Sequence, residues 1–595
     1  ASQVDAFVHH RPAVQLRPTP QLCTASAAGA AVAPPLAARP ARLRTPTPNA
    51  ALPALMPAWL SLIPPIATLI ASVTIRQTVL SMLFGIWTGA LLLAGGNPAT
   101  AVLRTFDVYV LQALADPEHA GVLLFTTILG GTIGLVQKSG GALGLANLVK
   151  GFFTTRRRGA LSTVALGSLV FFDDYSSILI VGNSLRPLLS AVRLSAAKFA
   201  YIAHVLGVVL ASLAPLSSWV GIQIGYIAGA YQQLAPFFGS AGTPDPFLAF
   251  LGTLPLRYFP LCMIIFVLLG ALTGRDFGPM LKAERDALDE GGAGASEEGT
   301  AVEEPVEDVS TGALDPEPST PLRAVNALVP FGCVLAASFG GMVSQGLGVI
   351  AAMPAAIRPA ASLVNALRYA DSVAALIWGS AFGWLASMGL VLAQRLMPLA
   401  DAMGAWVEGA KEVLEPTIVL VLAWALGAVI ADVGTAEFLA RALQAGLPAW
   451  ALPALVSTLC YAISFASGSA IGTMGIVFPL VGPLAMRLGG GSVSFLHQCF
   501  GSIMGGSLFG NICSPLSDTT ILTVLATRCS LPLHIGTLLG YTCLVGAIAL
   551  VFGDLAVGLG LYGPLMAISV CTALMTAIKF IVGRPVEGPR EPEKA

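Results

Sequence analysis

The stretch Phe171-Phe172-Asp173-Asp174-Tyr175-Ser176-Ser177 places two adjacent carboxylates inside an otherwise apolar run. That run extends over residues 160–182, close to the ~20 residues that a helix needs to cross the hydrocarbon core of a bilayer. A carboxylate at the centre of a lipid-facing helix costs roughly 3 kcal/mol, so such groups usually face a polar cavity and carry function. Neighbouring helical residues point about 100° apart. We therefore expect one of Asp173 and Asp174 to line an ion path and the other to pair with a neighbour or cap a broken helix.

The composition excludes an ordinary soluble protein. Of 595 residues, 55% are hydrophobic and 11% are charged, against roughly 25% charged residues in a typical soluble domain. The formal net charge of -1 suggests no nucleic-acid partner. The nine cysteines form no CxxC pair, and no GxxxxGK[ST] phosphate loop occurs. We expect a protein of the lipid bilayer, without a cofactor and without enzymatic activity.

The apolar runs predict an all-α polytopic fold with about 11–15 transmembrane or half-membrane helices, by the length that a span requires. Some runs are short and interrupted by Ser, Gly or Pro, which is typical of half-helices. The predicted runs cover residues 58–74, 77–95, 119–137, 159–182, 198–213, 215–232, 247–272, 324–348, 371–395, 415–431, 449–464, 473–488, 495–512, 533–553 and 560–582.

An acidic segment divides these runs into two groups. Residues 281–320 contain twelve Asp or Glu among Gly, Ser and Pro, a composition that cannot bury a core and indicates a disordered linker. The chain is therefore predicted to consist of an N-terminal segment, a first membrane half, an acidic linker, a second membrane half and a disordered tail, at residues 1–56, 57–274, 275–322, 323–583 and 584–595.

The N-terminal segment is basic, nearly free of acids and rich in small residues. Such a composition is typical of an organellar transit peptide, and its alternative is a disordered tail. We accordingly expect a multi-pass protein of a plastid or mitochondrial membrane, and otherwise of the plasma membrane.

The two halves resemble each other in motif order. The Asp173-Asp174 region parallels Phe465-Ala466-Ser467-Gly468, and Pro215-Leu216-Ser217-Ser218 parallels Pro515-Leu516-Ser517-Asp518. A weak repeat with interrupted helices at matching places indicates the binding site of a secondary transporter. We predict two repeat-related halves.

Oxygen-bearing residues gather around these interruptions, and hard cations such as Na⁺ prefer oxygen ligands. We predict an ion and proton site, with Na⁺ held at Asp174 and Asp518. Small-residue helix packing is the alternative explanation for the Gly/Ser segment near residue 469. The predicted site residues are Asp173, Asp174, Asp518, Ser176, Ser177, Thr519, Thr520, Ser514, Ser517, Ser469, Thr473 and Asn511.

Proton coupling follows from electrostatics, because burial and a like-charged neighbour both favour the protonated form of a carboxylate. If a cation and a proton compete for one carboxylate, binding one expels the other. His204 and Gln223 lie in predicted spans and are candidate members of a proton relay, although an intramembrane histidine is about as often a hydrogen-bonded structural group.

At these motifs the chain resembles the NhaC-type Na⁺/H⁺ antiporter family of the wider ion-transporter superfamily. The resemblance extends over residues 58–550 without the acidic linker. Three positions that are usually acidic in the family are His204, Gln223 and Asn511 here. The motifs that carry the resemblance are Phe171-Phe172-Asp173-Asp174-Tyr175, Val181-Gly182-Asn183, Arg186-Pro187, Lys198-Phe199-Ala200-Tyr201-Ile202, Ser218-Trp219-Val220-Gly221, Gly472-Thr473-Met474-Gly475 and Ser514-Pro515-Leu516-Ser517-Asp518-Thr519-Thr520-Ile521.

The resemblance implies a secondary transporter that exchanges a monovalent cation, Na⁺ first, for H⁺ by alternating access. The alternatives are an organic-acid transporter coupled to H⁺ or Na⁺ and a membrane protein that keeps the fold without transporting. An intramembrane aspartic protease is disfavoured, because no Gly-x-Gly-Asp pattern occurs. A homo-oligomeric assembly is compatible with the sequence.

Overall fold

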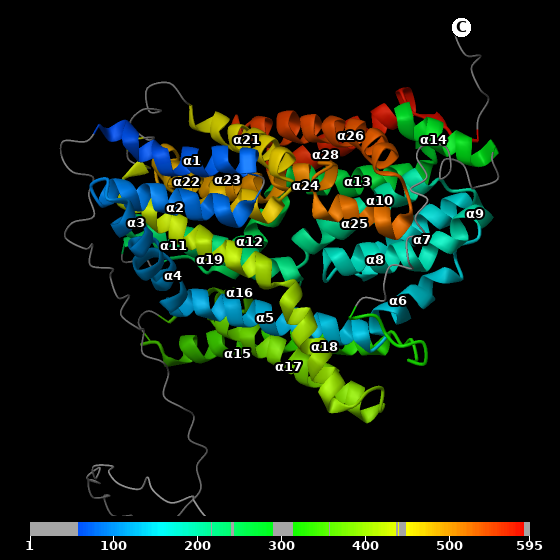
Figure 1. Ribbon diagram of the computed structural model, residues 1–595, viewed down its shortest axis with the longest axis horizontal. Helices are drawn as coiled ribbons and strands as arrows, with labels where there is room; N and C mark the ends of the chain where they lie inside the picture. The colour runs from blue at the N-terminus through cyan, green and yellow to red at the C-terminus, as the bar shows by residue number, and fades with distance from the viewer. Residues whose placement is uncertain are drawn as a thin grey trace, which may run out of the picture. The chain divides into compact units, whose positions relative to one another are not determined.

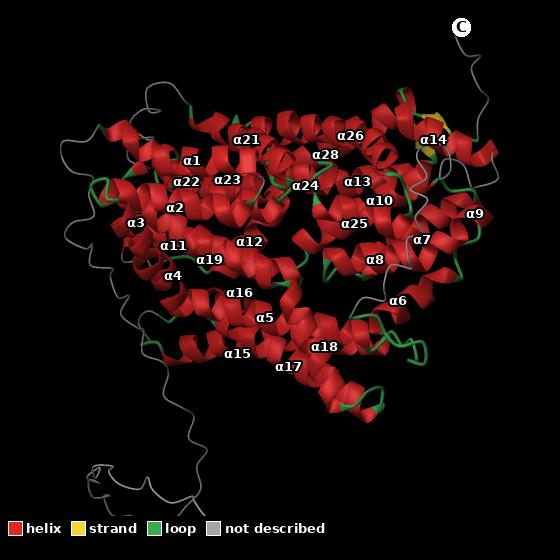
Figure 2. Ribbon diagram, in the orientation of Figure 1, coloured by secondary structure: helices red, strands yellow, loops and turns green. Residues whose placement is uncertain are grey.

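The computed structural model describes residues 57–75, 77–215, 217–239, 243–289, 313–355, 358–435, 438 and 448–587. Within these ranges the chain is almost entirely helical, with one pair of two-residue strands (Figure 2). The predicted N-terminal segment at 1–56 lies outside the described residues, as do residues 290–312 of the predicted linker.

The first half begins with three helices that pack at one end of the bundle and continues through the broken helices described below. Its elements are η1 (Ala58–Leu62), α1 (Ile63–Ile75), α2 (Thr78–Leu93), α3 (Pro98–Arg104), η2 (Thr105–Val110), α4 (Leu111–Ala115), α5 (Pro117–Lys138), α6 (Gly141–Lys150), α7 (Arg156–Leu169), α8 (Asp174–Leu185), η3 (Arg186–Leu188), α9 (Leu189–Val192), α10 (Ala196–Leu213), α11 (Ser218–Phe238), α12 (Pro246–Thr253), η5 (Leu254–Leu256), α13 (Tyr258–Thr273), β1 (Arg275–Asp276) and α14 (Gly278–Asp289).

The second half contains α15, which at 28 residues is the longest of the described helices. Its elements are α15 (Val325–Ala352), α16 (Leu363–Arg368), α17 (Ser372–Ala393), α18 (Leu399–Glu412), α19 (Leu414–Asp432), η6 (Ala449–Ala451), α21 (Leu452–Ser467), α22 (Ala470–Leu488), α23 (Val493–Gly506), α24 (Leu508–Cys513), α25 (Asp518–Thr527), α26 (Leu531–Ile548), η7 (Ala549–Leu555), α27 (Ala556–Gly558), α28 (Pro564–Ile581) and β2 (Arg584–Pro585).

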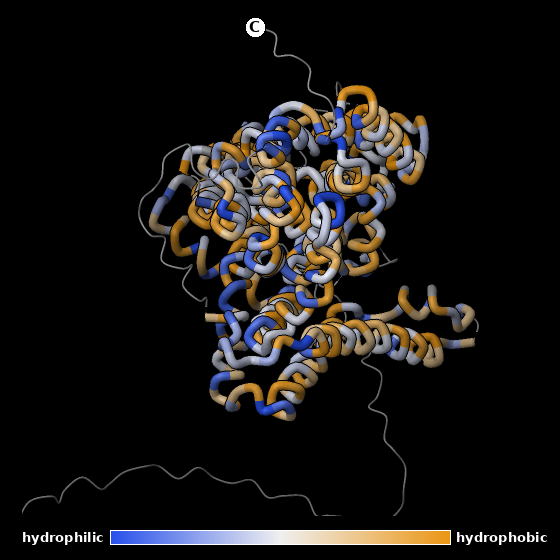
Figure 3. Tube along the Cα trace, turned by 90° about the vertical axis from the view of Figure 1, so that its right-hand side faces the viewer, coloured by the Kyte–Doolittle hydropathy of each residue, from blue (hydrophilic) through white to orange (hydrophobic). Residues whose placement is uncertain are grey.

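Among the described residues, nine helical segments are long and apolar enough to cross a membrane. A tenth span is obtained if the bent pair Pro246–Leu256 and Tyr258–Thr273, which turns by 53°, is counted as one. Figure 3 shows hydrophobic residues along most of the helical trace. The predicted all-α, multi-pass fold class is confirmed.

Four of the described helices end at a break in the apolar interior of the bundle, and a second helix begins directly after each break. The breaks separate α7 from α8, α10 from α11, α21 from α22 and α24 from α25. The side chains of Asp173, Ser217 and Ser469 cap the helices that follow three of these breaks. Gly468 has a φ of 73°, a left-handed conformation that glycine adopts at little cost. The motif pairs identified in the two halves therefore coincide with chain breaks.

The prediction of one continuous span over residues 159–182 was wrong. The helix stops at Leu169, and a new helix starts at Asp174. Asp173 lies in an extended conformation, and its carboxylate accepts a hydrogen bond from the Ser176 amide at 2.9 Å. This N-cap satisfies an amide that lacks a partner within the helix, and it stabilises the start of α8.

The boundaries of the predicted linker and tail also need correction. Residues 275–289 are ordered, because α14 buries Met280 and Ala287 together with Glu284, whose carboxylate lies 2.7 Å from the guanidinium of Arg156. Strand β1 pairs antiparallel with β2, with Arg275 opposite Pro585. The first residues of the predicted tail therefore close onto the segment that follows α13.

Helices of the two halves pack against one another. Helix α5 lies beside α17 and α18, and α8 lies beside α25 (Figure 1). The approach of α5 to α18 is close, since a Cβ added at Gly409 would lie 2.5 Å from the carbonyl oxygen of Gly130. Helix α10 runs through the interior, where most of its side chains are buried, including His204. These contacts bring the motifs of both halves to one place.

Candidate functional site

The acidic motifs of the two halves line one cavity of about 60 Å³. Its walls come from α8, α11, the junction of α18 and α19, the start of α22, α24 and the start of α25. The lining residues are Asp173, Asp174, Tyr175, Ser218, Trp219, Ile222, Glu412, Val413, Pro416, Ser469, Ala470, Ile471, Asn511 and Asp518. The breaks in the helices therefore open toward a shared space.

Asp173 connects two of the breaks. Its Oδ2 accepts hydrogen bonds from the amide and the hydroxyl of Ser176, at 2.9 and 2.6 Å, and its Oδ1 accepts from the hydroxyl of Ser218 at 2.7 Å. The Ser218 amide donates to the carbonyl of Phe172 at 2.8 Å. These bonds stabilise the carboxylate and join the start of α8 to the start of α11.

Asp174 and Asp518 occupy equivalent places as the first residues of α8 and α25. Asp174 is 4% exposed, whereas Asp518 lies at the exposed rim. The hydroxyl of Tyr175 donates to Asp518 Oδ2, and the amide of Thr519 donates to Asp518 Oδ1 at 2.7 Å. The positive end of each half-helix dipole favours a negative charge at this position.

The lining is acidic and rich in neutral oxygen atoms. It includes the carboxylates of Asp173, Asp174, Asp518 and Glu412 but no Lys, Arg or His. Several carboxylates that share a small, partly buried space repel one another, and a bound cation or proton relieves that repulsion. Hydroxyl and amide oxygens of Ser218, Ser469 and Asn511 complete a set that suits a hard monovalent cation.

A tightly coordinated ion is not indicated. Across the described ranges, no group of three or more His, Cys, Asp or Glu side chains is arranged to hold a metal ion. A site with a few carboxylates and several neutral oxygens fits an ion that is bound transiently better than one that is held permanently.

The structure brings together five of the predicted site residues as cavity lining: Asp173, Asp174, Ser469, Asn511 and Asp518. The other seven are not among the lining residues. Ser176 bonds Asp173, while Thr473 and Thr520 donate to the carbonyls of Ser469 and Ser514 at 2.7 and 3.0 Å. Ser514 Oγ accepts from the Leu516 amide, Ser177 Oγ is buried without a partner, and Ser517 and Thr519 bond each other at 2.9 Å.

The two candidate relay residues have different surroundings. His204 is fully buried, and its Nε2 lies 3.1 Å from Thr519 Oγ1. Gln223 lies away from the cavity: its Oε1 accepts from Arg257 at 2.9 Å, and its Nε2 donates to Ser212 at 2.8 Å. The Gln223 amide therefore satisfies a buried guanidinium.

Several lining residues were not predicted from the sequence. Tyr175, Ser218 and Trp219 belong to quoted motifs, so their proximity to the aspartates was a usable signal. Glu412 was not predicted as a site residue, yet it lies at the rim of the cavity beside Val413 and Pro416. The proline that follows α18 was the signal that the chain turns there.

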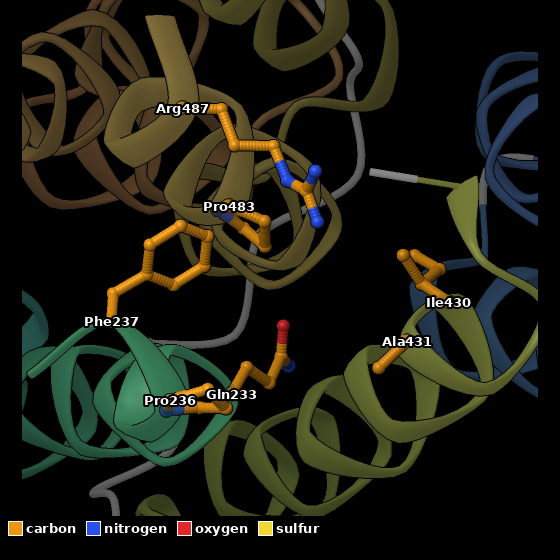
Figure 4. Close-up of a pocket in the computed structure, with 7 residues that line it drawn as sticks. All are labelled: Gln233, Pro236, Phe237, Ile430, Ala431, Pro483 and Arg487. Atoms are coloured by element: carbon orange, nitrogen blue, oxygen red, sulfur yellow. The ribbon is translucent and has the colours of Figure 1, made fainter. Parts of the chain in front are cut away.

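A second, larger pocket of about 260 Å³ lies elsewhere, between α11, α19 and α22. Figure 4 shows the guanidinium of Arg487 and the amide of Gln233 directed into it beside the ring of Phe237. Its lining contains no carboxylate. The smaller, acidic cavity is therefore the candidate ion site.

An acid-lined cavity at the breaks of helices in a multi-pass bundle defines the class of secondary membrane transporters. The comparison with known families agrees. Residues 210–559, more than half of the chain, match the sequence model of the Na⁺/H⁺ antiporter family, and the chain belongs to this family. The predicted family and the prediction of a transporter are thus confirmed, and the prediction that the chain is not an enzyme agrees with them.

Individual proteins are also similar to the chain. An uncharacterized protein of Haemophilus influenzae is 26% identical over 501 residues, which cover 84% of this chain and 90% of the relative. The solved structure of Neisseria gonorrhoeae MtrF, described within a class of antimetabolite efflux pumps, aligns with a TM-score of 0.49 at 14% identity, covering 89% of this chain and 97% of MtrF. The Alcanivorax borkumensis YdaH transporter, described as having an unusual topology, aligns with a TM-score of 0.49 at 17% identity, covering 79% and 90%.

Proposed function

We propose that the protein exchanges Na⁺ for H⁺ by alternating access, with the acidic cavity as the shared site. The observation that carries this proposal is the convergence of Asp173, Asp174 and Asp518, from two halves of the chain, on one small cavity. Membership in the Na⁺/H⁺ antiporter family supports the choice of ions.

The mechanism rests on competition for the carboxylates. Asp174 and Asp518 bind either a cation, together with the neutral oxygens of Ser469 and Asn511, or a proton. An unoccupied site in which Asp174 and Asp518 are both charged is costly to enclose in a low-dielectric bundle. Only occupied states therefore change access, and each Na⁺ that moves one way permits protons to move the other way.

Asp173 has a positioning role in this proposal. Its carboxylate is already engaged by Ser176 and Ser218. It fixes the break before α8, and so the position of Asp174, while its charge adds to the cost of leaving the cavity empty.

The dimensions and charge of the cavity favour a small cation over an organic anion. About 60 Å³ is room for a few waters or a partly dehydrated ion, on the scale of ~10–15 Å³ for each water. A carboxylate substrate would also need a cationic partner, and the lining offers none. No observation at this cavity specifically supports the organic-acid alternative.

The test is cation-dependent proton efflux from proteoliposomes that contain the full chain. Asp174→Asn and Asp518→Asn should each abolish Na⁺-induced dequenching of a pH-sensitive dye, because an amide cannot exchange a proton for a cation. Asp401→Asn, at an exposed position on α18, is the matched control and should retain wild-type efflux. Wild-type exchange in both site variants would refute the proposal. A panel of Na⁺, K⁺, Li⁺ and small carboxylates identifies the substrate.

We also propose an organellar membrane as the location. The support is the basic, acid-poor composition of residues 1–56. Imaging of the full chain with a C-terminal fluorescent tag, with and without these residues, tests it. Plasma-membrane signal from both forms would contradict it.

A further inference from the structure

Two histidines that are far apart in the sequence form a buried pair behind the cavity. His204 Nδ1 on α10 lies 3.0 Å from His534 Nε2 on α26, and the ring centroids are 5.2 Å apart. Both side chains are 0% exposed. Buried ionisable side chains within a membrane bundle usually serve proton or ion movement.

The pair continues into a line of hydroxyl groups that reaches the cavity. His204 Nε2 lies 3.1 Å from Thr519 Oγ1, and Thr519 Oγ1 lies 2.9 Å from Ser517 Oγ. Ser517 Oγ is 3.5 Å from Asp518 Oδ1 and 3.2 Å from Asn511 Oδ1, and both of these residues line the cavity. Ser517 and Thr519 are themselves buried. Side chains alone thus connect the carboxylate at the rim to His534.

The donors and acceptors in this line permit two orders. In one, His534 Nε2–H donates to His204, His204 Nε2–H donates to Thr519, and Thr519 donates to the Asn511 carbonyl at 3.1 Å. In the other, each hydroxyl donates toward His204, and His204 Nδ1–H donates to His534. The hydrogen bonds of the line can therefore point in either direction. Only in the second order is His204 Nε2 unprotonated and able to accept a proton.

Among the residues that the structure describes, no carboxylate bonds the pair directly. Helix α10 meets α8 where a Cβ at Gly207 would lie 3.3 Å from the carbonyl of Asp174. Tyr201, one turn before His204, packs edge to face against Tyr541, with ring centroids 5.5 Å apart. Beyond them, Asp276 bonds Lys198 and Lys579, and Glu284 bonds Ser195 at the start of α10. His534 Nδ1 is buried without a hydrogen-bond partner.

We propose that the His204–His534 pair is the proton acceptor for the cation site, so that Asp518 loses its proton to this pair when Na⁺ binds. This inference rests on the proposed exchange of Na⁺ and H⁺. It assigns a role to His534, and it places the displaced proton outside the cavity, where it does not compete with Na⁺ for space before it leaves the protein.

The transfer balances along the line. The carboxylic acid of Asp518 gives its proton to Ser517 Oγ, Ser517 passes its own hydroxyl proton to Thr519, and Thr519 passes its proton to His204 Nε2. Asp518 becomes a carboxylate, each hydroxyl regains one proton, and the pair becomes one imidazolium shared with a neutral imidazole. The facing nitrogens of the two rings are 3.0 Å apart, so the pair holds one additional proton rather than two, because two imidazolium charges this close repel each other.

The experiment separates proton coupling from cation movement in proteoliposomes. His204→Gln and His534→Gln keep an amide capable of hydrogen bonding but cannot take a proton. Positioned proton acceptors contribute ~10²–10⁴-fold in rate, so Na⁺-driven proton efflux should fall by about 100-fold in both variants. Tracer Na⁺/Na⁺ counterflow at symmetric pH should stay within about two-fold of wild type, since the cation oxygens are intact.

His497→Gln is the matched control, because His497 bonds Tyr231 at 2.6 Å on α11 and does not belong to the line. It should leave both fluxes unchanged. If either pair variant does not fold, Thr519→Val and Thr519→Ser replace it: valine should uncouple the protons, and serine should restore coupling.

Wild-type proton efflux in the pair variants, or equal loss of counterflow and efflux, would overturn the inference and leave the pair a structural contact. Absence of Na⁺ counterflow in the wild-type protein would instead refute the proposed function. The two failures are therefore distinct.

Discussion

Replacing Asp276 with Asn should destabilise the protein more than most single substitutions. Asp276 is 1% exposed and accepts from Lys198 Nζ at 2.7 and 3.0 Å, from Lys579 Nζ at 3.1 Å and from the Tyr541 hydroxyl at 2.9 Å. The lysines are 2% and 0% exposed. Removing one partner of a buried ion pair costs about 3–5 kcal/mol, because the remaining charge stays buried without compensation. Here two ammonium groups lose their common partner.

The contribution of Asp276 to stability should depend on pH. Burial raises the pKa of Asp276, but the charges of Lys198 and Lys579 together lower it by more, so its pKa lies below the usual range. A carboxyl group with a lowered folded-state pKa contributes stability above its unfolded pKa of about 3.9, and this contribution is lost as pH falls through the folded-state pKa. Asp276→Asn should therefore lower the melting temperature at neutral pH and flatten the acid limb of the stability profile.

The measurement is intrinsic-fluorescence melting of the detergent-purified protein between pH 3 and pH 8. Asp401→Asn, an exposed acid on α18, serves as the control and should leave the profile unchanged. Equal melting of Asp276→Asn and wild type at neutral pH would refute the reasoning. An acid limb as steep as that of the wild type would do so as well.

Two further substitutions test contacts near the site. Ser218→Ala removes a hydroxyl that donates to Asp173 at 2.7 Å. It should destabilise the protein by about 1.5–3 kcal/mol, the value of a hydrogen bond to a charged group. Ser569→Ala, at an exposed position on α28, is the control, and equal melting temperatures for the two variants would contradict the assigned contact. Gln223→Leu leaves the buried Arg257 without one acceptor at 2.9 Å and should destabilise by about 1–3 kcal/mol. Gln223→Glu should retain wild-type melting, because it restores an acceptor, and a loss equal to that of leucine would refute this reading.

The sequence predicted the positions of the acids better than the path of the chain. Pro515 marks one break by removing a backbone donor. The break before Asp174 carries no proline, and its local sign is the N-cap Asp173 with its bond to Ser176. The break also depends on the bond of Asp173 to Ser218 at the start of α11. A tertiary contact of this kind leaves no local signal.

Contacts between residues that are far apart in the chain could not be predicted from the sequence either. His204 was identified as a candidate alone, since His534 is 330 positions away and belongs to an unremarkable apolar run. Gln223 was expected near a proton path, but its direction depends on Arg257, which lies at a bend inside the run predicted over residues 247–272. In α14, the acidic composition of the surrounding segment obscured the helical spacing of Met280, Ala283 and Ala287, which lie on one buried face.

The pairing of β1 with β2 has a consequence for biosynthesis. The corner after α13 is completed by α28, the last helix among the described residues, and by the residues that follow it. Arg275 donates there to the carbonyls of Lys579 and Gly583 at 3.1 Å. Until that helix inserts, Asp276 has Lys198 but not Lys579. The first half is therefore synthesised before one of the two lysines that bind Asp276, and this corner can close only after α28 has been made.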